Sequence, residues 1–193
     1  MWAGKTLLNL DGPVHTRLRR HVFRSFTRGS VEQLRPTVDK LTDTLLDDLA
    51  DSGQGDLMER VAFRLPIAVI GELLGVPKQD LPPFRERTLA LTAAFEIGVT
   101  KEMLDAADTA AGECIAYFND LIADKRAHPA DDLISRLVRD ADGAAGDDAL
   151  TDEEINSLAT LVFFAGFETT TNMIGNGILA LLDQPEQLDL LRA

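Results

Sequence analysis

The sequence predicts a mainly α fold, with one long central helix and shorter helices around it. Apolar residues recur every three or four positions along most of the 193 residues, which is the spacing of one helix face. Alternating apolar and polar runs typical of strands are nearly absent. The loops between predicted helices are short and no linker or repeat divides the chain, so residues 1–193 are interpreted as one domain.

Pro13 and Ser30 mark the first two predicted helices. Proline suits the first turn of a helix, and apolar residues follow Pro13 at every fourth position, namely Val14, Leu18 and Val22. Ser30 and Gln33 have the spacing of a capping box, which predicts that the next helix begins at Ser30. This helix should end near residues 51–53, where a glycine supplies the usual exit.

The middle of the chain predicts three more helices. The apolar stretch 57–76 suggests a loop or short strand and then a buried helix over about residues 66–74, which Gly75 ends. Two prolines predict the start of a helix over about residues 82–94. A long amphipathic helix follows, and its apolar face consists of Leu104, Ala107, Ala111, Ile115, Phe118 and Ile122.

The last third contains the strongest helix signal. Residues 133–138 predict a short helix before a turn rich in glycine and aspartate at 141–148. The segment 151–154, Thr-Asp-Glu-Glu, is a capping box whose acids suit the positive end of the helix dipole. From there a helical pattern runs without proline to residue 183, which predicts an unusually long helix before a short final one.

The centre of this long helix, residues 164–171, has an unusual composition. A glycine and three consecutive threonines are poor helix formers. The Thr169 hydroxyl can bond the Ala165 carbonyl and bend or open the helix, while Gly166 would leave a side-chain-free surface for a ligand. Glu168 adds an ionisable group suited to handling protons. The alternative interpretation is a kinked core helix with a solvent-facing glutamate.

A second candidate site lies near the start of the chain. His15 and Arg19 are four residues apart, so they lie on one face of the first predicted helix. Two such groups can clamp a carboxylate or phosphate. The alternative interpretation is a surface helix with a basic stripe.

The composition argues against several other functions. A net charge of -13 disfavours nonspecific nucleic-acid binding. The single cysteine, Cys114, excludes an internal disulfide, and three scattered histidines predict no metal site made of protein ligands. The longest apolar region, 158–182, contains Glu168, Asn172 and Asn176, which a membrane span tolerates poorly. With no signal peptide recognised, we expect a cytoplasmic protein with no membrane partner.

Several motifs together carry a family resemblance. Residues 11–20 resemble the C-helix segment of bacterial cytochromes P450, with Gly12 in place of the proline in the usual D-P-x-H-x-x-x-R pattern. Residues 165–170, Ala-Gly-Phe-Glu-Thr-Thr, resemble the I-helix signature A/G-G-x-D/E-T-T. Three further matches lie between them in the expected order, namely Phe26-Thr27, Leu65-Pro66 and the run from Glu72 to Pro77. The chain is therefore identified as resembling the middle portion of a bacterial-type cytochrome P450.

The resemblance implies a haem (heme) cofactor of b type. His15 and Arg19 would bond a haem propionate, and Ala165 and Gly166 would lie over the distal haem face. In the family a cysteine thiolate binds the iron from a C-terminal F-x-x-G-x-x-x-C-x-G loop, and we expect that cysteine to lie outside this chain. Cys114 sits in a predicted helix without such a loop and is interpreted as a small buried hydrophobe.

The implied activity is that of a monooxygenase, which inserts one oxygen atom from O2 into a small, hydrophobic organic substrate. Glu168 and Thr169 would be its catalytic residues, because the family uses them to deliver protons. A ferredoxin-type electron donor would meet the basic segment around Arg17, Arg20 and Arg24.

We expect residues 1–193 to form a partial cytochrome P450 domain that is not catalytically competent alone. Residues 79–95 and 100–126 would be the helices that cover the substrate pocket. The chain could be a fragment, a truncated homologue that associates with itself or with a complementing chain, or a non-catalytic helper such as a glycosyltransferase activator. Incomplete cores would expose apolar faces. A helical binding module unrelated to the family is a further alternative.

Overall fold

The computed structural model of the protein describes residues 6–144 and 146–192, and every regular element in this part is helical, which confirms the mainly α prediction. These described residues form nine α-helices connected by short turns. Their bounds are α1 (Gly12–Ser25), α2 (Arg28–Glu32), α3 (Arg35–Asp51), α4 (Arg64–Leu74), α5 (Pro82–Ala93), α6 (Lys101–Ala127), α7 (Leu133–Gly143), α8 (Asp152–Asp183) and α9 (Pro185–Arg192). Single turns lie at η2 (Leu7–Asn9), η3 (Met58–Ala62), η4 (Lys78–Asp80) and η5 (Gly146–Asp148).

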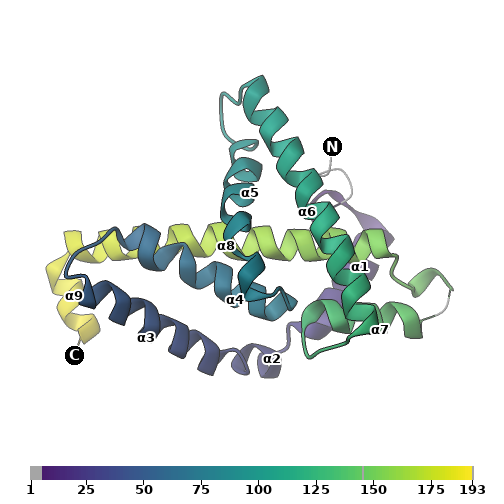
Figure 1. Cartoon of the computed structure of the whole chain (residues 1–193), viewed down its shortest axis with the longest axis horizontal. Helices are drawn as coiled ribbons and strands as arrows, with labels where there is room; N and C mark the ends of the chain where they lie inside the picture. Colours follow the sequence, from purple (N-terminus) through teal and green to yellow (C-terminus); the bar gives the residue numbers. More distant parts are fainter. Residues whose placement is uncertain (1–5, 145, 193) are drawn as a thin grey trace.

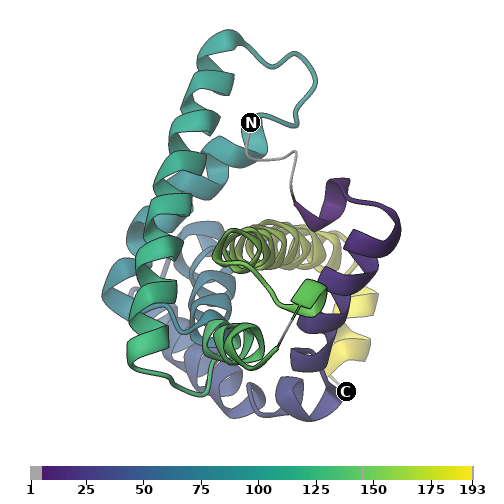
Figure 2. The same cartoon turned by 90° about the vertical axis from the view of Figure 1, so that its right-hand side faces the viewer.

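The 32-residue helix α8 is the axis of the molecule, as predicted. It runs along the long dimension in Figure 1 and is seen nearly end-on in Figure 2, with the other helices around it. Helices α3 and α4 lie along one side, whereas α1 and α7 lie near its N-terminal end. Helices α5 and α6 form a hairpin that projects away from the other helices.

The predicted start of α8 is confirmed in atomic detail. The Thr151 hydroxyl accepts a hydrogen bond from the Glu154 amide at 3.2 Å, and the Glu154 carboxylate accepts one from the Thr151 amide at 2.9 Å. Gly75, the predicted end of α4, adopts a φ of 77°, and a Cβ there would collide with the Asp132 carboxylate. Glycine is therefore required at position 75 both for its backbone conformation and for space.

The prediction that a helix begins at Ser30 was wrong. Thr27 is the N-cap of α2, since its hydroxyl accepts from the Ser30 amide at 3.2 Å while Ser30 Oγ accepts from the Thr27 amide at 2.9 Å. Ser30 therefore lies inside a short helix, and Gln33 follows its end. The next helix, α3, begins at Arg35, because Pro36 fits the first turn, where no intrahelical N–H bond is lost.

Two further boundaries differ from the predictions. Residues 58–62 form the π-helical turn η3 instead of a loop or strand. Helix α4 begins at Arg64, two residues before the predicted start, because Pro66 occupies its first turn.

The predicted apolar face of α6 is buried in part. Leu104 and Ile115 are exposed, while the remaining members of that face are buried.

Aromatic residues join the projecting hairpin to α8. The ring of Phe84 on α5 lies 4.5 Å from that of Phe163 on α8 and 5.7 Å from that of Phe118 on α6, measured between centroids. All three side chains are buried. The hairpin is also closed by a hydrogen bond of 2.8 Å from the Tyr117 hydroxyl to the Asp80 carboxylate.

The C-terminal end of α6 is held by polar contacts. Lys125 on α6 and Asp132 before α7 form a largely buried ion pair at 2.7 Å. Arg126 bonds the Asp152 carboxylate at the start of α8, also at 2.7 Å. The Asn156 amide on α8 donates to the Asn119 side chain at 2.7 Å. One end of α6 is thus fixed to both α7 and α8.

Helix α1 is joined to α8 through Arg17. Its guanidinium pairs with the Glu154 carboxylate and donates to the Ala149 carbonyl at 3.2 Å. The buried His21 lies on the packed side of the same helix, where its Nε2 donates to the Asp148 carbonyl at 3.1 Å. Together these contacts fix the rotation of α1 about its own axis.

Arg17 sets the ionisation of Glu154. Partial burial alone would raise the pKa of the Glu154 carboxyl, but bonds from Arg17 and from the Thr151 amide outweigh it and hold that pKa below its ordinary value of 4.5. A depressed folded-state pKa means that the pair stabilises the fold fully at pH values above that ordinary, unfolded-state pKa. This stabilisation is lost as the pH falls through the lower folded-state pKa.

We therefore predict that Arg17→Met lowers the free energy of unfolding by about 1–2 kcal/mol at pH 7. The difference from the unsubstituted chain should shrink as the pH is lowered from 5 to 3, as measured by urea denaturation at each pH. Arg20→Met is the matched control, because the pair of Arg20 with Asp148 is half exposed and should contribute less than about 1 kcal/mol. Equal losses for both variants at every pH would contradict the assignment.

Candidate functional site

Helix α8 has two opposite faces in its central part. Phe163, Phe167 and Thr171 recur at every fourth position and are at most 3% exposed. Ala165 and Thr169 have the same spacing two residues out of phase and are exposed, and Met173 continues this face with 71% exposure. Because two residues turn a helix by about 200°, burial of the first set directs the second set outward. We call Ala165, Thr169 and Met173 the open face of α8.

Thr169 and Ala165 are joined on the open face. The Thr169 hydroxyl donates to the Ala165 carbonyl at 2.6 Å, which is the bond predicted from the sequence. The expected opening of the helix does not follow, because α8 is continuous from Asp152 to Asp183. The Thr169 hydroxyl thus donates to the Ala165 carbonyl in addition to the backbone hydrogen bonds of an intact helix.

Gly166 faces α4 and not open space. A Cβ at this position would lie 2.9 Å from Ile70 Cδ1 and 3.4 Å from Ile70 Cγ1. The prediction that Gly166 leaves a side-chain-free surface for a ligand is therefore corrected, since Ile70 occupies that space. The glycine lets α4 approach α8 closely, and Ala165 is the small residue that remains on the open face.

Glu168 is half-buried and has a partner that the sequence analysis missed. Its Oε1 accepts a hydrogen bond of 2.9 Å from the Asn172 side-chain amide, one helical turn along α8. The spacing of four residues between them was a signal that could have identified the pair. The bond orients the Glu168 carboxylate along the surface of the helix.

His15 and Arg19 lie on the side of α1 that does not pack inward. His15 is half-buried and Arg19 is exposed, whereas Leu18 and His21 of the same helix are at most 3% exposed. In the part of the chain that the structure describes, no ion pair or hydrogen bond joins His15 or Arg19 to the residues of α8. Their donors remain available to an anion.

The cations predicted to meet an electron donor are placed differently from one another. Arg17 and Arg20 form ion pairs with Glu154 and Asp148 inside the chain. Arg24 is exposed near the C-terminal end of α1. The available charge on this helix is therefore smaller than its sequence suggests.

Cys114 is buried on α6 at 4% exposure. Burial raises the pKa of its thiol to about 11, so the group stays protonated at neutral pH. A protonated core thiol is not a ligand for iron. Among the described residues, no group of three or more histidine, cysteine, aspartate or glutamate side chains is arranged to hold a metal ion.

Exposed apolar side chains occur on and near α8. Phe95, in the connection between α5 and α6 and 63% exposed, lies 6.0 Å from Phe164 of α8 between ring centroids. Apolar residues are also exposed toward the C-terminal end, as expected, namely Leu179, Leu182, Leu190 and Leu191. None of the described helices is both long enough and apolar enough to cross a membrane.

Comparison with known proteins gives consistent matches. The family model described as Cytochrome P450 matches residues 95–193. The cytochrome P450 monooxygenase PikC of Streptomyces venezuelae is 46% identical over 97% of this chain and 43% of its own length. The vitamin D(3) 25-hydroxylase of Pseudonocardia autotrophica is 42% identical over 96% of this chain and 44% of its own length. The chain thus spans less than half the length of these relatives.

Solved structures agree with the sequence matches. P450BioI, solved in complex with an acyl carrier protein carrying hexadec-9Z-enoic acid, superposes with a TM-score of 0.91 at 32% identity. The match covers 99% of this chain and 48% of that one. The polyketide synthase cytochrome P450 PksS of Bacillus subtilis has a TM-score of 0.85 at 34% identity, over 98% of this chain and 47% of its own.

The packing role of Gly166 can be separated from its helix propensity by comparing it with Gly177. Gly177→Ala meets nothing within 4 Å and should stabilise the chain by about 0.5–1 kcal/mol. Gly166→Ala should be less favourable than Gly177→Ala by about 1–2 kcal/mol, because its Cβ presses on Ile70. Urea denaturation measures both changes.

Ile70→Val provides the control, since it removes the Cδ1 atom that Gly166→Ala would meet. In that background the difference between the two alanine variants should fall by at least half. An equal benefit from both alanines in the unsubstituted chain would contradict the close contact with α4.

Proposed function

This chain belongs to the cytochrome P450 family, and on that basis we propose that it forms part of a haem-dependent monooxygenase acting on a hydrophobic organic substrate. The observation that supports this most directly is the open face of α8. It combines a small residue, Ala165, with a hydroxyl donor, Thr169, on an exposed apolar stripe. A flat macrocycle can approach such a surface closely.

The residues of α1 and α8 fit a haem with two anionic propionates. His15 and Arg19 present donors on one side of α1 that no ion pair within the described residues occupies. We assign them to a propionate, because a charged pair at this spacing suits a carboxylate. We assign Ala165 to the distal face of the macrocycle, while Gly166 acts by admitting Ile70 beside it.

When bound, a haem with a thiolate ligand supplies the activation of O2 for insertion of one oxygen atom into a substrate. The chain contributes proton handling. Thr169 Oγ1 carries a proton directed at the Ala165 carbonyl, and rotation about χ1 can redirect it across the open face. The Glu168 carboxylate, oriented by Asn172, is the neighbouring group that can exchange a proton with solvent.

Two components must come from elsewhere in this proposal. Cys114 is a buried, protonated thiol, so the thiolate ligand lies outside these residues. Electrons come from a ferredoxin-type donor. Of Arg17, Arg20 and Arg24, Arg24 is the cation that is exposed and forms no ion pair within the described residues.

The proposed substrate is mainly hydrocarbon. Phe95 and Phe164 approach each other beside Ala165 and would contact a ligand on the open face. Vitamin D3 and hexadecenoic acid, named with two of the similar proteins, are both largely apolar molecules. Aromatic and apolar linings bind such ligands through buried area.

Haem affinity tests the assigned propionate contacts. Titration of the chain with haem, followed by absorption, should show binding that His15→Ala and Arg19→Ala each weaken about tenfold, equivalent to about 1.4 kcal/mol. Haem dimethyl ester lacks the anionic propionates, so the two variants should bind it as tightly as the unsubstituted chain does. His128→Ala, at the exposed histidine that caps the C-terminal end of α6, is the control. Equal weakening for both ligands would contradict the assignment.

Thr169 is tested in the catalytically complete enzyme. We predict that Thr169→Ala uncouples oxygen consumption from product formation by about tenfold, because no hydroxyl then directs a proton at this position. Thr169→Ser retains the hydroxyl and should restore most of the coupling. Product yield per O2 consumed is the measurement, and unchanged coupling in the alanine variant would remove the role given to Thr169.

A further inference from the structure

A concave surface lies between α4 and α5, and none of its lining residues belongs to the open face of α8. It has a volume of about 500 Å³, within the range of small-molecule sites. Its walls come from η3 and the start of α4 on one side and from η4 and the start of α5 on the other. The lining residues are Glu59, Phe63, Arg64, Ile67, Ala68, Lys78, Leu81, Pro82 and Arg85. None of them belongs to the residues assigned to haem, and we call this surface the α4–α5 pocket.

The floor of the pocket is apolar. Phe63 and Ile67 are half-buried on the side of α4, and Leu81 is 8% exposed beneath the start of α5. Phe63 is held in place from behind by Phe167 of α8, at 6.1 Å between ring centroids. A preformed apolar floor that remains partly open to solvent favours a ligand with a hydrocarbon or aromatic body.

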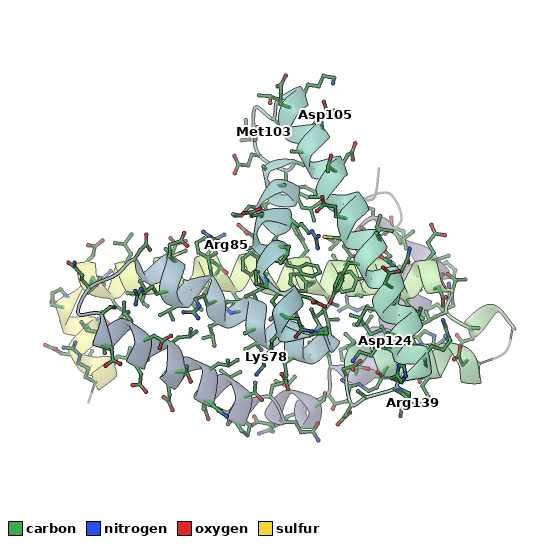
Figure 3. All side chains as sticks on the ribbon, viewed as in Figure 1. Lys78, Arg85, Met103, Asp105, Asp124 and Arg139 are labelled. Carbon is green, nitrogen blue, oxygen red and sulfur yellow. The ribbon has the colours of Figure 1, made fainter. Side chains whose placement is uncertain are left out.

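The rim of the pocket is cationic. Arg64, Lys78 and Arg85 line it together with a single acid, Glu59. Figure 3 labels Lys78 and Arg85, which come from the connection between α4 and α5 and from α5 itself. A net positive rim on a chain of net charge -13 departs from the rest of the surface. It complements an anion and not a cation.

The three cations differ in how freely they can bind a ligand. Arg85 pairs with Glu59 and its guanidinium lies 4.5 Å from the centroid of the Phe63 ring, so it is already oriented. Arg64 is 3.7 Å from the Asp48 carboxylate. Lys78 is exposed and forms no ion pair within the described ranges 6–144 and 146–192. Its neighbour Asp80 is bonded instead to the Tyr117 hydroxyl.

From this arrangement we propose that the α4–α5 pocket binds an amphipathic monocarboxylate. The hydrocarbon body packs on Phe63, Ile67 and Leu81, and the carboxylate pairs with Lys78. Arg85, paired with Glu59 and fixed over Phe63, extends the packing surface at the same rim. The site is independent of haem, so its test is carried out without it and its outcome leaves the monooxygenase proposal unaffected.

The test is titration of the ¹⁵N-labelled chain with sodium decanoate below its micelle concentration, followed by amide chemical shifts. We expect saturable shifts concentrated in residues 63–68 and 78–85. Decan-1-ol, which has the same chain without the charge, should bind about tenfold more weakly at low salt. No saturable shift with decanoate, or equal affinity for the alcohol, would overturn the proposal.

Charge reversal at the rim locates the carboxylate. Lys78→Glu should weaken decanoate binding about tenfold or more and leave decan-1-ol binding unchanged, because only the anion interacts with the lysine. Lys101→Glu is the matched control at an exposed lysine near the tip of the hairpin, where Figure 3 labels Asp105. Lys78→Met, which keeps much of the apolar stem, should give an intermediate loss. Equal effects of the Lys78→Glu and Lys101→Glu changes would show that net charge alone governs binding.

Discussion

The structure depends on the way in which α8 divides its surface. Phe163, Phe167 and Thr171 are buried against neighbouring helices, and Gly166 admits Ile70 of α4 between them. Helical geometry then leaves no choice about where Ala165 and Thr169 lie, because they are two positions away from the buried stripe. The open face is thus a consequence of packing on the opposite side. A substitution at the contact between α8 and α4 would therefore rotate or displace Ala165 and Thr169, although neither of these residues would itself be changed.

A single carboxylate links the N-terminal helix to this axis. Glu154 closes the capping box with Thr151 and also pairs with Arg17 of α1. Glu154 therefore fixes both the start of α8 and the rotation of α1 about its own axis. His21 packs inward on α1, so His15 and Arg19 are directed to the other side of the helix. The positions of His15 and Arg19, which we assign to a propionate, therefore depend on the contact between Arg17 and Glu154.

Much of the fold was predictable because its signals are local. The capping box at Thr151, the glycine exit at Gly75 and the Thr169 bond to Ala165 each depend on residues within one helical turn. The start of α2 was misjudged because Thr27, Ser30 and Gln33 offer overlapping capping patterns, and only the backbone geometry chooses among them.

Contacts between distant segments were not predictable in this way. The pairing of Arg17 with Glu154 joins residues 137 positions apart. The role of Gly166 likewise depends on which side of α8 receives α4, and periodicity alone does not specify a neighbour. The family motifs identified the residues of the candidate site, whereas the free and occupied cations of α1 could be told apart only from the ion pairs.

The unequal support of α6 has a mechanical consequence. Lys125, Arg126 and the Asn119 contact hold its C-terminal end to α7 and α8, while its N-terminal end stands at the tip of the projecting hairpin (Figure 1). About 17 residues separate Lys101 from the held region, a lever of roughly 25 Å at 1.5 Å per residue. A tilt of about 5° at the held end would carry the tip by roughly 2 Å over that length. Small rearrangements near Asn119 therefore translate into displacements near Lys101, at the tip of the hairpin, that are comparable in size to the radius of an atom.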